Sequence, residues 1–196
     1  MFDALAFATY MGVMSVTPGP NNLMLATSGV NHGFRRTLPH MLGISAGCAL
    51  QLVLTVAGWA WLTRGLEQWR LPLAFAGCAY LMWLSWQLWR SAAPGAREAG
   101  RPLGFVGAVL FQWVNPKAWL MTVNAALVFA PGDGAGTLAM ALLAAAVNLP
   151  CIAVWALFGD RLRTALQDAR WLRLFNAAMA LLLALTALWL LADAAG

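Results

Sequence analysis

Six long apolar runs dominate this chain and restrict what it can fold into. They cover residues 4–30, 38–62, 71–89, 103–130, 137–158 and 172–191. Each reaches the roughly 20 residues that a helix needs to cross about 30 Å of hydrocarbon. A backbone in lipid must form its own hydrogen bonds, and a barrel would need alternating polar residues, so solidly apolar runs predict helices. We expect an all-α integral membrane protein with six transmembrane helices.

The charged residues lie mainly between these runs. Charged residues make up only 10% of the chain, against about 25% in soluble domains. The net charge of +5 comes from short basic clusters, a pattern typical of membrane loops rather than of a nucleic-acid surface. Nine arginines occupy the first, third and fifth connections: Arg35, Arg36, Arg90, Arg97, Arg101, Arg161, Arg163, Arg170 and Arg173. The opposite side has only Arg64 and Arg70, so the positive-inside rule places both termini outside.

The first and fourth runs differ from the others because each contains a proline motif near its middle. They are the first spans of two three-span halves, approximately residues 1–91 and 102–196, joined by a cytoplasmic loop within one membrane domain of residues 1–196. Three is an odd number, so the second half must be inverted relative to the first. An inverted repeat with interrupted helices at matching positions indicates a transporter binding site.

The first motif is Pro18-Gly19-Pro20-Asn21-Asn22. Proline lacks a backbone N–H and clashes with the preceding turn, so two prolines around a glycine should unwind the helix. The segment after Pro20 would begin a new half-helix, with its free N–H groups and positive dipole end near the membrane centre. A simple packing kink is the alternative, but the matched second break favours a binding site.

The second motif is Asn115-Pro116-Lys117. Pro116 should start another half-helix from the opposite direction, so that two positive helix ends converge and favour a carboxylate. Lys117 is the only lysine in the chain. A charge inside a span is costly and is by default a functional candidate. The alternative is that its long stem reaches an interface or that its ammonium binds carbonyls of a broken helix.

Other polar residues within or beside the spans are weaker candidates. Gln51 continues the face of Gly43 and Gly47, a small-residue pattern that allows close helix packing. Asn124 lies two turns beyond Lys117 and either lines the pathway or bonds a neighbouring helix. In the fifth run, Asn148 with Pro150 forms either a kink or a contact with the ligand. We interpret His32 and His40 as solvated loop histidines and Asp160 as an interfacial charge.

Cys48, Cys78 and Cys151 all lie inside apolar runs, without a CxxC pair or metal-ligand spacing. We interpret them as small packing residues placed away from the helix breaks. No metal site and no cofactor is expected, and the spans contain no clustered set of residues for hydrolysis. A membrane thiol-redox protein is an alternative, but it would need two reactive cysteines facing each other at the breaks.

Five segments together resemble the LysE/RhtB family of amino-acid exporters. They are TPGPNN at 17–22, HGFR at 32–35, GISAG at 43–47, AYLMWL at 79–84 and FQWVNPKA at 111–118. The likeness covers essentially the whole chain, and the TPGPNN form resembles the branch that handles cysteine and O-acetylserine. The resemblance implies export of amino acids or their derivatives from the bacterial cytoplasm, driven by the proton gradient. It therefore also implies a multi-pass protein of the bacterial inner membrane.

One position departs from the family pattern. Many relatives carry histidine eight residues after the glycine matching Gly43, where this chain has Gln51. Glutamine cannot titrate, so a proton role at that position does not carry over, and Lys117 and Asp160 are the remaining candidates for proton coupling.

These observations predict a secondary exporter, not an enzyme, which binds small neutral amino acids at the two breaks and exchanges them for protons. A passive small-solute channel is the other alternative. The expected partners are the lipid bilayer, the amino acid and protons, without nucleic acid. Small residues on several helices are compatible with a homodimer as well as with packing inside one subunit.

Overall fold

The fold is entirely helical in the part of the chain that the computed structural model describes, residues 3–91, 102–166 and 168–195. The helices are α1 (Ala4–Val16), α2 (Pro20–His32), α3 (Phe34–Ala57), α4 (Trp59–Ser91), α5 (Phe105–Gln112), α6 (Pro116–Phe129), α7 (Gly134–Ala165) and α8 (Ala169–Ala195). The predicted helical class is thus confirmed over these ranges. The connection at 92–101, with Arg97 and Arg101, lies outside the described residues.

Three of the described helices are long and apolar enough to cross a membrane, at Phe34–Ala57, Gly134–Ala165 and Arg170–Trp189. The shorter helix α1 is also apolar. Local chemistry explains several helix ends. The Asp3 carboxylate accepts from the N–H groups of Leu5 and Ala6 at 3.0 Å, and Asp133 accepts from Gly136 at 2.6 Å, so both side chains cap helix starts.

Between α2 and α3 the chain turns at Gly33, whose φ of 83° is the left-handed value that glycine adopts without strain. This single residue lets α3 begin directly after α2.

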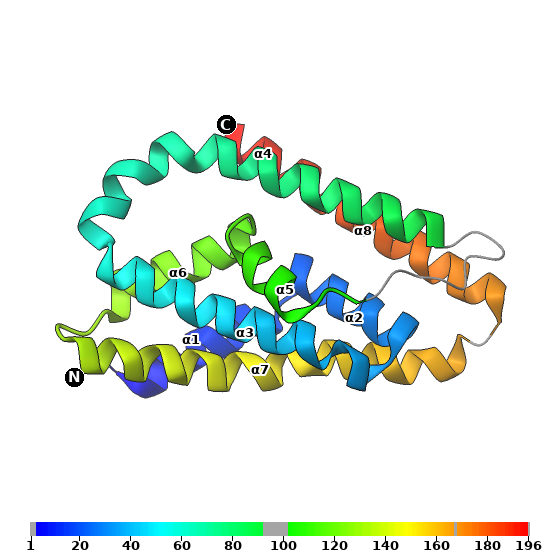
Figure 1. The fold of residues 1–196 in the computed structure, drawn as a ribbon, viewed down its shortest axis with the longest axis horizontal. Helices are drawn as coiled ribbons and strands as arrows, with labels where there is room; N and C mark the ends of the chain where they lie inside the picture. Colours follow the sequence, from blue (N-terminus) through cyan, green and yellow to red (C-terminus); the bar gives the residue numbers. More distant parts are fainter. Residues whose placement is uncertain (1–2, 92–101, 167, 196) are drawn as a thin grey trace.

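One boundary differs from the sequence-based expectation. The second and third apolar runs were predicted to be separated by a polar connection containing Arg64 and Arg70. Instead α4 begins at Trp59 and is continuous through that segment, and only Gly58 separates it from α3. In Figure 1 its first part curves away from the end of α3 before it runs beside α8. Charged residues can interrupt an apolar run while the helix continues, because helices end at residues that favour a cap or a turn, such as glycine, and a charge alone does not end them.

The interior helices pack around α7 and α3 (Figure 1). Helix α7 contacts α1, α2 and α3, while α3 also contacts α5 and α6. A methyl group on Gly29 would collide with the Ala156 carbonyl, and one on Gly159 with the Ala26 carbonyl. These two glycines therefore allow the backbones of α2 and α7 to touch, as small residues do between membrane helices.

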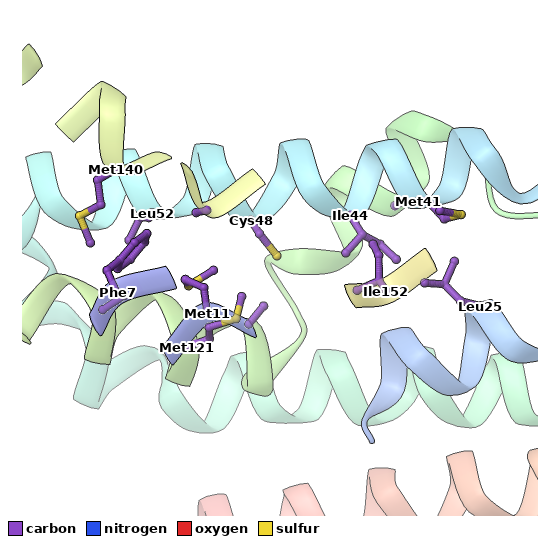
Figure 2. Close-up of a cluster of buried hydrophobic side chains, with 14 of the residues drawn as sticks. Phe7, Met11, Leu25, Met41, Ile44, Cys48, Leu52, Met121, Met140 and Ile152 are labelled. Atoms are coloured by element: carbon purple, nitrogen blue, oxygen red, sulfur yellow. The ribbon is translucent and has the colours of Figure 1, made fainter. Parts of the chain in front are cut away.

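Six helices, α1, α2, α3, α5, α6 and α7, contribute to one sulfur-rich core, part of which Figure 2 shows. Its labelled side chains are Phe7, Met11, Leu25, Met41, Ile44, Cys48, Leu52, Met121, Met140 and Ile152. Methionine is flexible and fills irregular space. Methionine therefore suits this core, because two interrupted helices leave irregular space that regular helix–helix packing would not.

The distribution of polar and apolar side chains is inverted relative to a soluble protein. Large apolar side chains are exposed along the outer helices, among them Trp83, Trp86, Trp89, Trp171 and Trp189. Amide side chains are instead buried: Asn22, Gln51, Gln112, Asn115, Asn148 and Asn176. Buried polar groups must find partners inside the protein, and an apolar exterior of this extent matches lipid as the surrounding solvent.

Candidate functional site

The first helix interruption is wide. Helix α1 ends at Val16 and α2 begins at Pro20, which occupies the first helical position. Between them the backbone is extended, with φ −63° and ψ 143° at Thr17 and φ 176° and ψ 178° at Gly19. An extended segment cannot accept helical hydrogen bonds, so the last carbonyls of α1 need donors from elsewhere.

Side chains from three helices supply those donors. The Lys117 ammonium of α6 donates to the Thr17 carbonyl at 2.6 Å, the Thr17 hydroxyl at 2.9 Å and the Pro18 carbonyl at 3.2 Å. The Asn22 amide of α2 donates to the carbonyls of Ser15 at 2.9 Å and Thr17 at 2.7 Å. From α7, the Trp155 indole donates to Val16 at 3.0 Å. The negative end of α1 is therefore stabilised by tertiary contacts, including one full positive charge.

The second interruption is narrow and bonded locally. After α5 ends at Gln112, backbone N–H groups of Trp113, Val114 and Asn115 donate three residues back, at 3.1, 3.1 and 3.3 Å. The Asn115 side chain then accepts from the Lys117 N–H at 3.1 Å and caps α6, which begins at Pro116. Such tight turns satisfy helix ends without remote partners.

An amide pair joins the two interruptions. The Asn21 amide donates to Gln112 Oε1 at 2.9 Å, and Gln112 Nε2 lies 3.4 Å from Asn21 Oδ1. Behind this pair, Gln51 Nε2 donates to the Gln112 carbonyl at 3.4 Å. Gln51 Oε1 is buried and has no hydrogen-bond partner among the described residues. Gln51 thus contacts the backbone of Gln112, whose side chain pairs with Asn21.

Between the two interruptions lies a cavity of about 30 Å³. Its polar lining comprises Ser15, Gly19, Asn21, Asn22, Asn115, Lys117 and Asn148, and its other walls include Met14, Cys48 and Met121. One water requires roughly 10–15 Å³ on this measure, so the cavity has room for about two waters. An amino acid would not fit in this volume without a rearrangement.

The N-terminus of α2 faces this cavity with no side-chain cap from the described residues, whereas α6 has its Asn115 cap. Pro20 has no N–H group, and the amides of Asn21 and Asn22 follow it in the first turn. The three oxygens that accept from the Lys117 ammonium are neutral. Positive potential from the helix end and from the ammonium is thus concentrated at one small polar cavity.

Most of the residues selected from the sequence lie at this place. Gly19, Asn21, Asn22, Asn115 and Lys117 line the cavity. Pro18 contributes its carbonyl, and Pro20 and Pro116 begin the two half-helices.

Two other selected residues do not line the cavity. Gln51 lies behind Gln112, and the side chain of Asn124 lies against the Tyr10 hydroxyl. Sequence reasoning did not select Gln112 and Ser15. A polar residue inside an apolar run, three positions before Asn115, was the available signal for Gln112.

Two structural interpretations made from the sequence are wrong. His40 is not a solvated loop residue: it is 1% exposed within α3, because that helix begins at Phe34 and carries His40 inside the protein. Cys48 is not remote from the breaks: it lines the cavity, with its thiol 3.6 Å from Gln112 Oε1. Cys78 and Cys151 are not among the cavity residues, and all three cysteines are free.

Comparison with known proteins finds a match to the family described as LysE type translocator over residues 12–194. A cysteine/O-acetylserine efflux protein of Klebsiella pneumoniae is 38% identical over 52 residues, which cover 26% of each chain. The protein with the same description from Escherichia coli strain K12 is 39% identical over 49 residues, or 25% of each chain. The alignments thus span about a quarter of the length of these curated relatives. No solved structure matches the chain.

Proposed function

The chain belongs to the LysE type translocator family, and from this premise we propose that it exports small neutral amino acids or their derivatives in exchange for protons. Cysteine and O-acetylserine are the first candidates, because the relatives described above are named as efflux proteins for these compounds. Family membership and the apolar exterior agree with a multi-pass protein of the bacterial inner membrane.

The observation that carries this proposal is the shared cavity of the two interruptions. A substrate carboxylate would accept from the uncapped first turn of α2 and lie near the Lys117 ammonium. The Asn115 and Asn21 amides would supply neutral hydrogen bonds to the α-amino group and the carboxylate. Binding in this way uses only the carboxylate and the ammonium of the zwitterion, so the substrate needs no net charge.

In this structure, where the cavity is too small for an amino acid, Lys117 binds the carbonyls of Thr17 and Pro18. We propose that substrate entry displaces this ammonium toward the carboxylate, which releases the extended segment between α1 and α2. The Lys117 ammonium would thus contact the α1-end carbonyls when the site is empty and the carboxylate when the site is occupied. A ligand can drive a conformational change only if its contacts differ between the two conformations, and this exchange would supply such a difference.

The helix contacts support an inverted repeat of α1–α4 and α5–α8 as six spans. Suppose that α1, α2, α3 and α4 are equivalent to α5, α6, α7 and α8. The contact between α2 and α7 is then equivalent to the one between α6 and α3, and the contact between α1 and α7 to the one between α5 and α3; all four are present. Likewise α2–α8 exchanges with α6–α4, while α3–α7 and α4–α8 map onto themselves. We propose that these halves, approximately 1–91 and 102–196 of a single domain, rock around the cavity to alternate access.

The proposed orientation follows from the arginines. Arg35, Arg36, Arg161 and Arg163 lie at the junction of α2 with α3 and at the end of α7, and by the positive-inside rule this end faces the cytoplasm. Both termini would then be periplasmic, and solute would enter from the arginine-rich end.

Efflux from proteoliposomes tests the proposal. Vesicles loaded with labelled cysteine or O-acetylserine should release the label when a pH gradient, acidic outside, is imposed, and the rate should saturate with internal concentration. Release that is linear in concentration and indifferent to the gradient would identify a channel. Retention of both compounds and of a wider panel of neutral amino acids would contradict the proposed function.

A further inference from the structure

A second cavity, of about 130 Å³, lies at the other end of α2. It is bounded by α2, α3, α4, α8 and residues 102–103. Its polar lining consists of Thr27, Ser28, Asn31, His32, His40 and Gln87, and its apolar walls include Met24, Leu84 and Leu183. The cavity is about four times as large as the one between the helix breaks.

Two residues that line this cavity carry three buried polar atoms without a partner among the described residues. They are Nδ1 and Nε2 of His40 and Oγ1 of Thr27. The neighbouring polar side chains are paired: the Ser28 and Thr37 hydroxyls lie 2.8 Å apart, and Asn31 donates to Asn176 at 3.1 Å. Buried polar groups rarely lack partners, so the free atoms of His40 and Thr27 point to an occupant.

The chemistry of these atoms defines that occupant. A neutral imidazole offers one donor and one acceptor, and a threonine hydroxyl offers both. A small molecule that both donates and accepts hydrogen bonds matches them, and the apolar walls suit a short side chain. A dry engineered cavity of 150 Å³ holds benzene, so 130 Å³ accepts a solute of roughly six non-hydrogen atoms.

The cavity also lies in line with the first site. Asn21, Met24, Ser28 and Asn31 are spaced by three, four and three residues, so they share one face of α2. Asn21 lines the first cavity and the other three line the second. At 1.5 Å per residue, the ten residues from Asn21 to Asn31 span about 15 Å. The second cavity is at the end that carries Arg35 and Arg36.

From this geometry we infer that the 130 Å³ cavity is a second binding site, which holds a small polar amino acid or derivative before it reaches the helix breaks. This inference rests on the proposed function, because it assigns the cavity to the same solute. His40 and Thr27 bind the polar groups of the solute, and the shared face of α2 leads toward Asn21. Export from the cytoplasmic end would use this site first.

Calorimetry with L-cysteine, which has close to the number of non-hydrogen atoms that the cavity accepts, and the purified protein tests the number of sites. The natural chain should bind two molecules, and the double variant His40→Leu with Thr27→Val should bind one. In proteoliposomes the KM from the cytoplasmic side should rise about tenfold, since lost hydrogen bonds each reduce affinity several-fold. The maximal rate should change less than twofold. The matched control is Thr186→Val, whose hydroxyl bonds Leu182 within α8 at 2.7 Å.

Thermal unfolding gives a readout that a structural role would not produce. Replacing unpartnered buried polar groups with apolar ones should leave the melting temperature unchanged or raise it. A lower melting temperature with unchanged KM would show that His40 serves packing, and would overturn the inference. One bound molecule in the natural chain, with normal transport, would mean that the second cavity holds only water and would overturn it while the proposed function stands. Absence of both binding and transport in the natural chain would overturn both.

Discussion

The two helix interruptions are built on different principles. At the second, between α5 and α6, the backbone bonds that end one helix are local and Asn115 caps α6 from within the turn, while the remote Gln51 adds only a long bond of 3.4 Å to the Gln112 carbonyl. At the first, between α1 and α2, the carbonyls of residues 15–18 depend on Lys117, Asn22 and Trp155. A locally bonded turn keeps its shape when its surroundings move, whereas an extended segment held by remote side chains does not.

This difference assigns distinct roles to the two interruptions. In the proposed mechanism the second would be the fixed element, which projects Lys117 from a capped helix start. The first would be the responsive element, because its geometry would depend on whether Lys117 binds its carbonyls. The symmetry suggested by two proline motifs is therefore a symmetry of chain path and not of chemistry.

Replacing Lys117 should have the largest effect on stability and on efflux. Lys117→Met removes three hydrogen bonds from a charged donor at the first interruption. Bonds to charged groups contribute about 1.5–3 kcal/mol each at best, so we expect a loss of about 2–3 kcal/mol in unfolding free energy and no measurable efflux. Thermal unfolding in detergent and proteoliposome efflux check both. Normal efflux by the folded variant would reject Lys117 as a site residue.

Asn22→Leu should have the second-largest effect on stability and on efflux. It leaves the Ser15 carbonyl without its donor and the Thr17 carbonyl with Lys117 alone, in a position where Asn22 is 2% exposed. We expect a cost of about 1–2 kcal/mol, seen as a lower melting temperature, together with slower efflux. Asn124→Leu is the control outside the cavity and should affect efflux less. Equal effects from both variants would contradict a special role for the first interruption.

Asn115 tests the second interruption. Asn115→Ala should cost about 1 kcal/mol through the lost cap of α6. Asn115→Asp should restore the melting temperature, because aspartate caps helices as well as asparagine does. Its negative charge at the cavity would repel a substrate carboxylate, so the KM for efflux should rise. An Asp variant with the natural KM would argue against an anionic guest.

Gly19→Ala should have the smallest effect on stability and still reduce transport. The added methyl group would lie 2.8 Å from Lys117 Cδ and 3.2 Å from its ammonium nitrogen, so the flexible lysine must shift. We expect less than about 0.5 kcal/mol in stability and about tenfold slower efflux. Gly132→Ala, where a methyl group would meet no atom within 4 Å, is the control. Unchanged efflux in Gly19→Ala would mean that the ammonium position is unimportant.

The sequence by itself determined the features that depend on local composition and local backbone chemistry. Apolar runs are sufficient to indicate helices with a lipid-facing exterior, and the motifs at 17–22 and 111–118 were sufficient to indicate the family. Pro20 and Pro116 stand at the first position of α2 and α6 because proline suits that position and few others in a helix.

Only the tertiary structure decided which groups meet. Nothing near Lys117 in the sequence shows that its ammonium reaches Thr17, 100 residues earlier, or that Asn21 pairs with Gln112, 91 residues later. The buried position of His40 and the placement of Cys48 at the cavity were missed for the same reason. Composition reports how each residue prefers lipid, water or a helix end, but the partner of a buried polar group depends on how the helices pack, and that packing is a property of the whole fold.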